Sequence, residues 1–85
     1  MREMIEHLLR APDHELDAQM KPLIEKWSEP PTALQVLEVL DYTIHGALAS
    51  GFVVAVLQAL YDIRCKEEGT THEEVEKLAE WRKRL

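Results

Sequence analysis

The chain has 85 residues, of which 46% are hydrophobic, and its 16 acidic and 10 basic side chains give a formal net charge of −6. A chain of this length forms a single domain, residues 1–85, near the size at which one core becomes marginal and oligomerisation adds buried surface. The apolar content excludes a disordered chain, and the negative charge argues against a general nucleic-acid binder, which needs a basic surface to displace counterions from phosphates.

The N-terminal third has the pattern of two amphipathic helices. Apolar residues recur at helical spacing from Met4 to Leu9, and Pro12 ends this first helix because proline disfavours helical backbone at the residue before it. Asp13 is then expected to cap the second helix. The apolar stripe of that helix keeps its phase across Pro22, so we predict one helix that is kinked at this proline.

Two capping boxes mark later helix starts. Thr32 with Gln35, and Thr71 with Glu74, place a hydroxyl three residues before an amide or carboxylate. This arrangement satisfies two of the free amides at a helix N-terminus. Gly69 supplies a stop signal just before the second box, since glycine readily adopts the left-handed conformation that ends many helices. Helices are therefore predicted to begin at positions 32 and 71.

The segment between these starts is unusually apolar. From Asp41 to Asp62 no residue between them can carry charge except His45. Glycine and serine between positions 45 and 51 predict a turn there, followed by a long helix to about Glu67. A membrane span is the alternative, because about 20 residues suffice. The small residues and amphipathic neighbours favour the all-α interpretation, a small bundle of four to five helices with a long apolar central helix.

One strip of the central helix predicts close helix packing. Small side chains recur at every fourth position, and two polar residues flank them. The set comprises Ala47, Gly51, Ala55, Gln58, Ala59 and Asp62. Small residues let two helix backbones approach closely, so the strip is expected to dock a helix of this chain or of a second subunit. Because short helices cannot cover the whole apolar circumference, we expect a homo-oligomer, most simply a dimer.

One set of side chains is a weak candidate for chemistry. Glu38, Asp41 and His45 share one side of the predicted helix, where they could ligate a metal ion. Di-iron bundles, however, require Glu-x-x-His pairs on two helices, and this pattern is absent. We interpret the three residues as a solvated helix edge. The sequence contains no glycine-rich phosphate loop and no H-E-x-x-H motif, so we expect no catalytic residue, no metal and no cofactor.

Two classes of function remain. The favoured one is a small acidic helical module for protein interaction or regulation, such as an adaptor, an inhibitor or an immunity-like protein, that binds a protein partner. The alternative is an oligomeric metal-binding or enzymatic bundle that uses Glu38, Asp41, His45 and Asp62. The single cysteine, Cys65, and the absence of a signal-peptide pattern predict a cytoplasmic location, with neither nucleic acid nor membrane as a partner.

Overall fold

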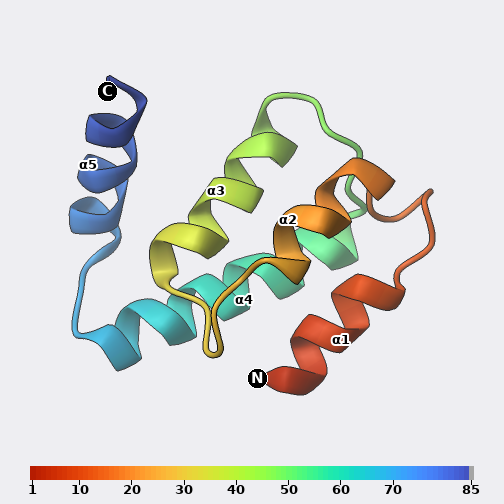
Figure 1. Cartoon of the computed structure of the whole chain (residues 1–85), viewed down its shortest axis with the longest axis horizontal. Coiled ribbons are helices and arrows are strands. Elements are labelled where there is room, and N and C mark those ends of the chain that lie inside the picture. The colour runs from red at the N-terminus through yellow and green to blue at the C-terminus, as the bar shows by residue number, and fades with distance from the viewer. Residues whose placement is uncertain (85) are drawn as a thin grey trace.

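The computed structural model describes residues 1–84, which form five α-helices and no β-strand (Figure 1). In chain order the elements are α1 (Arg2–Arg10), the 3-10 turn η1 (Ala18–Met20), α2 (Lys21–Glu25), α3 (Ala33–Ile44), α4 (Gly51–Glu68) and α5 (His72–Lys83). Helix α3 packs on α4 and α5, while α1 packs on α2 and α4. Helices α1 and α5 therefore lie at opposite ends of the molecule, and the predicted all-α class is confirmed.

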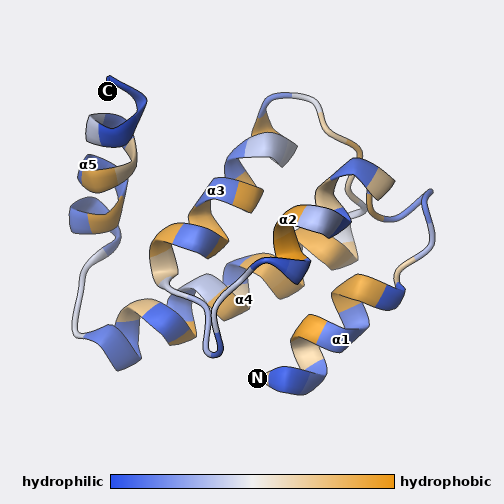
Figure 2. Cartoon of the chain, in the orientation of Figure 1, coloured by the Kyte–Doolittle hydropathy of each residue, from blue (hydrophilic) through white to orange (hydrophobic). Residues whose placement is uncertain are grey.

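The core draws on every helix. Hydrophobic and hydrophilic residues alternate along each of them (Figure 2). The largest completely buried side chains are Leu8, Leu16, Ile24, Pro31, Val36, Val39, Val53, Leu57 and Leu60. Burying one leucine, isoleucine or valine side chain contributes about 1.5–3 kcal/mol, so this set supplies most of the driving force for folding. Helix α5 adds only Val75 to the core, so it is the least buried of the three longer helices.

The helix ends follow the local chemistry of the sequence. In α3 the amide of Gln35 donates to the Thr32 hydroxyl at 3.1 Å, and the Thr32 amide donates to the Gln35 side chain at 3.0 Å. Thr71 and Glu74 repeat this arrangement at the start of α5, with distances of 3.1 and 3.2 Å. Gly69 ends α4 in the left-handed region, with φ of 71°. Both predicted capping boxes and the predicted stop are confirmed.

A buried arginine connects α4 to the start of α3. The Arg64 side chain is almost fully buried, and its Nε donates to the carbonyl oxygen of Pro31 at 2.6 Å. Its two terminal nitrogens contact Glu67 and Glu68. Glu68 in turn accepts the backbone amide of Ala33 at 3.0 Å. This network fixes the approach of the Pro-Pro segment and α3 to the second half of α4.

The single helix predicted around Pro22 is wrong. Pro22 lies in the first turn of α2, which follows η1 directly. Proline is favoured there because the amides of the first helical turn have no intrahelical acceptor to lose. The capping residue of this region is Asp17, whose side chain accepts the Gln19 amide at 2.9 Å, and not the expected Asp13. Because η1 and α2 follow each other directly, their apolar residues keep the spacing of a single helix, although the segment is two short elements.

Helix α4 begins after a turn, as predicted, but its central position is not confirmed. Its buried residues are Val53, Leu57, Leu60, Tyr61, Arg64 and Cys65. The opposite side of α4 is open to solvent along its length. None of the helices in residues 1–84 combines the length and the hydropathy that crossing a membrane requires. Within one chain, α4 is thus covered on one side only.

Candidate interaction surfaces

The small-residue strip lies on the open side of α4. Gly51, Ala55 and Ala59 are exposed, and Ala47 is half-buried in the turn before the helix. A methyl group built on Gly51 would meet no atom within 4 Å. The buried residues of α4 lie on its other face, so the small residues of the strip do not form the packing contact with α3. Whether a second subunit covers it stays a prediction.

Two large apolar side chains extend this strip. Phe52 is 58% exposed and Ile63 is 38% exposed, and both lie on the outward side of α4. The Phe52 ring meets the ring of His7 edge-on, with 5.2 Å between the centroids, so α1 borders the strip at this point. The sequence predicted that part of the apolar circumference of this helix would stay uncovered within one chain, and Phe52 and Ile63 lie on that part.

The candidate metal ligands lie together but are already paired. Glu38, Asp41 and His45 line one open depression of about 360 Å³. Glu38 pairs with Arg82 at 2.6 Å, and Asp41 pairs with Lys83 at the same distance. The hydrogen bond from Lys83 to Asp41, with the charge of that carboxylate, raises the pKa of the Lys83 ammonium. These two ion pairs attach the end of α5 to α3.

The fourth residue of the alternative site lies elsewhere. Asp62 pairs with His72 across the α4–α5 junction, with 2.7 Å between Oδ1 and Nε2. In residues 1–84 no group of three or more histidine, cysteine or carboxylate side chains is arranged to hold a metal ion. The structure therefore brings together three of the four residues, and two of those three have cationic partners.

A groove that the sequence did not reveal lies between α3, α4 and α5. It consists of two hollows of about 300 and 330 Å³, both lined by Leu37 and Ile44. We call it the α3–α5 groove. Its apolar lining residues are Leu37, Leu40, Ile44, Val54, Tyr61 and Ala79. Ile44 is 76% exposed, more than any other large apolar side chain in residues 1–84. Apolar surface of this kind is stabilised when another apolar surface covers it.

Carboxylates surround this groove. The acidic lining residues are Glu38, Asp41, Asp62, Glu76 and Glu80, against one lysine, Lys83, and one histidine, His72. Glu38, Asp41 and Asp62 have the partners described above. Glu76 and Glu80 form no ion pair with any residue in the range 1–84. The rim of the α3–α5 groove is therefore negatively charged.

Some residues that line the groove stand out in the sequence. Gln58 and Asp62, predicted to flank the strip, also line the groove, so these two residues border both surfaces. In the sequence, the apolar residues between Ala33 and Ile44 already cover more than half of this helix, which is wider than one packing contact needs. The sequence did not indicate that Glu76 and Glu80 border a groove, because acidic residues on an amphipathic helix are normally solvated.

No family model, curated protein or solved structure matches the chain. The function is therefore inferred from the surfaces themselves.

Proposed function

We propose that this chain is a small acidic helical module of the cytoplasm that acts by binding a protein partner, as an adaptor or an inhibitor does, without catalysing a reaction. The observation that carries the proposal is the α3–α5 groove, where Ile44 stands 76% exposed beside an apolar floor. A contiguous exposed apolar surface with a polar rim is typical of a protein-binding site.

Helices border the groove on two sides. Its sides include α3 and α5, each of 12 residues. A helix of that length spans about 18 Å, so a partner helix of about three turns could lie alongside them. Amphipathic helices bind such grooves through apolar side chains that recur on one face. The alternative, a metal-binding or enzymatic bundle, has less support, because Glu38 and Asp41 are occupied by Arg82 and Lys83.

We also assign the expected self-association to the strip on α4. Its exposed Ala55 and Ala59 would let a second copy approach closely, and Phe52 and Ile63 would add apolar area at its edges. The strip and the α3–α5 groove share Gln58 and Asp62. A dimer formed through the strip would therefore place the groove of each subunit next to the interface.

The test of the proposal is affinity capture with three forms of the protein from the cells that produce it. These are the wild type, Ile44→Glu in the groove, and Leu48→Glu as a matched control. Leu48 is 53% exposed in the turn before α4 and does not line the groove. Both substitutions place a carboxylate at an exposed apolar position, and circular dichroism checks that each variant stays helical.

We expect at least one protein to be captured equally by the wild type and Leu48→Glu and to be depleted by about tenfold or more with Ile44→Glu. Losing the burial of one isoleucine costs about 1.5–3 kcal/mol, and about 1.4 kcal/mol corresponds to tenfold in affinity. Identical sets of captured proteins for all three forms would contradict the proposal.

A further inference from the structure

We propose that the occupant of the α3–α5 groove is an amphipathic helix of a partner protein whose flanks carry lysine or arginine. This inference rests on the proposed function and adds the chemistry of the partner. It follows from the shape of the groove, the charges on its rim and the lack of a suitable helix elsewhere in the chain.

The apolar floor of the groove would be covered by large apolar side chains on one face of the partner helix. Two adjoining hollows share Leu37 and Ile44, so each can receive one large side chain while Ile44 contacts both. Anchors on successive turns of one helix have this arrangement. Val54 and Tyr61 from α4 close the bottom of one hollow, and Ala79 from α5 lines the other.

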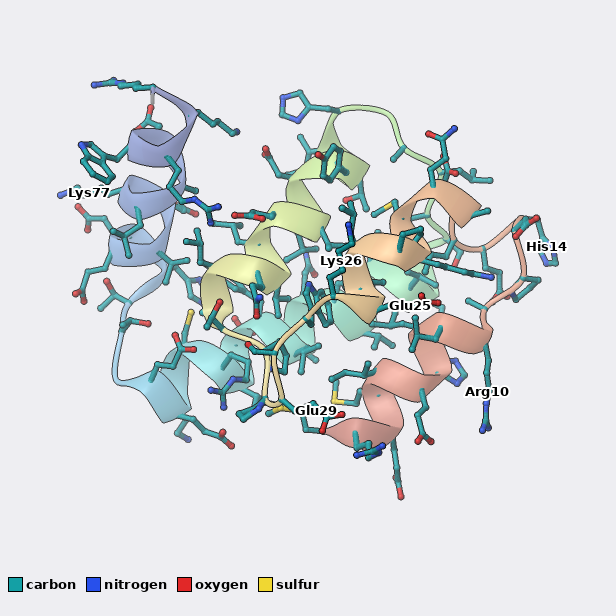
Figure 3. All side chains as sticks on the ribbon, in the orientation of Figure 1. Arg10, His14, Glu25, Lys26, Glu29 and Lys77 are labelled. Atoms are coloured by element: carbon teal, nitrogen blue, oxygen red, sulfur yellow. The ribbon has the colours of Figure 1, made fainter. Side chains whose placement is uncertain are left out.

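The rim selects a basic partner. Glu76 and Glu80 are one turn apart on α5, are both exposed, and form no ion pair within residues 1–84. Lys77, which follows Glu76, points away from α3 and pairs with Glu73 at 3.4 Å, so it leaves the groove acidic (Figure 3). A partner with cations at its flanks would neutralise the two free carboxylates, whereas an acidic helix would face repulsion.

Carboxylates also lie near the floor of the groove. Burial raises the pKa of the Tyr61 phenol, and the neighbouring groups Cys65, Glu76 and Asp62 raise it further. Tyr61 and Asp62 line the same hollow, so a carboxylate also lies at this end of the groove. A cation near this end of the groove would be stabilised by several carboxylates at once.

A second copy of the chain offers no free helix with these properties. The basic end of α5 is occupied within its own chain, because Arg82 pairs with Glu38 and Lys83 pairs with Asp41. The apolar face of α1 packs on α2 and α4, and its Leu8 is completely buried. We therefore assign the groove to a different protein.

The test uses two synthetic peptides and the full chain. Both peptides are amphipathic helices of about 18 residues, long enough for appreciable helicity. They share leucines at helical spacing, and one carries lysine on its flanks where the other carries glutamate. Binding is followed by fluorescence anisotropy of the labelled peptide at low salt and at physiological salt. We expect the lysine peptide to bind at least about tenfold more tightly and to weaken as salt is added.

Variants localise the effect to the groove. Glu76→Gln with Glu80→Gln is expected to weaken binding of the lysine peptide by about three- to tenfold and to reduce its salt dependence, because two exposed ion pairs with the peptide are removed. The matched control, Glu3→Gln with Glu25→Gln, changes the net charge equally but lies on α1 and α2, which are away from α5 (Figure 1). This control should bind the peptide almost as the wild type does.

Several results would overturn the inference. Equal binding of both peptides, no binding of either below millimolar concentration, or equal losses in the two double variants would each show that the rim does not select a basic helix. A dimer that Ile44→Glu converts to a monomer would assign the groove to a second copy. If affinity capture depends on Ile44 while the two peptides bind alike, the proposed function stands and this inference fails.

Discussion

Replacing Arg64 by methionine is expected to destabilise the fold, because one buried side chain connects α4 to α3. Its Nε bond to the Pro31 carbonyl oxygen is short, at 2.6 Å, and both residues are buried. A hydrogen bond from a charged donor contributes about 1.5–3 kcal/mol, and the unpaired carbonyl would remain without water. Methionine fills the volume of the arginine stem, so the cavity term is small.

The carboxylates that contact Arg64 change this estimate only slightly. The side chain of Glu67 is 57% exposed and that of Glu68 is 26% exposed. Solvent weakens the contact with Glu67, while Glu68 retains its hydrogen bond from Ala33. We expect a loss of about 2–3 kcal/mol in the free energy of unfolding, which lowers Tm by about 10–20 °C in a domain of this size.

Urea unfolding followed by circular dichroism measures this loss. Arg64→Lys should fall between the wild type and Arg64→Met, because lysine keeps the charge but cannot bond the carbonyl and two carboxylates together. Lys66→Met is the control, an exposed cation two residues away whose removal should cost less than about 0.5 kcal/mol. If Arg64→Met is as stable as this control or more stable, the network does not hold the two helices together.

Three further predictions concern α2, α4 and the alkaline limit of stability. Pro22→Ala should cost up to about 1 kcal/mol, since proline in the first turn of α2 restricts the unfolded chain; a gain in stability would instead favour the kinked helix. Ala55→Leu should shift a dimer toward monomer in light scattering while the chain stays helical, and a wild type that is monomeric at high micromolar concentration would contradict the strip as a subunit contact. The raised pKa of Tyr61 means that the unfolded chain releases the phenol proton first, so stability should fall as pH rises above about 10. The raised pKa of Lys83 also predicts lower stability at high pH, because its ion pair with Asp41 is lost when the ammonium deprotonates. Urea midpoints between pH 8 and 11 should fall less in Tyr61→Phe than in the wild type, and equal falls would contradict the argument.

The parts of the fold that depend on local chemistry could be predicted from the sequence. The pairs Thr32 with Gln35 and Thr71 with Glu74 lie three residues apart, so their hydrogen bonds need only the helix that they begin. Pro22 misled because η1 and α2 follow each other directly, and a continuous apolar phase does not distinguish one kinked helix from two short elements.

The candidate site depends on contacts that no local pattern encodes. Arg82 and Lys83 reach Glu38 and Asp41 across separations of 44 and 42 residues, and these pairs set the place of α5 beside α3. Only that placement makes Ile44, an exposed apolar residue of α3, part of a groove. The carboxylates of α3 looked like candidate metal ligands in the sequence because their cationic partners lie on α5, at least 42 residues away.

The central claim is that the chain acts through a protein bound in the α3–α5 groove, and site-specific photo-crosslinking in the producing cells tests it most directly. A photo-reactive amino acid replaces Ile44 in one variant and Leu48 in the other, both at exposed positions. We predict that position 44 yields a covalent adduct with a different protein, through a basic amphipathic segment, and that position 48 does not. No adduct at position 44, or the same adducts at both positions, would contradict the claim.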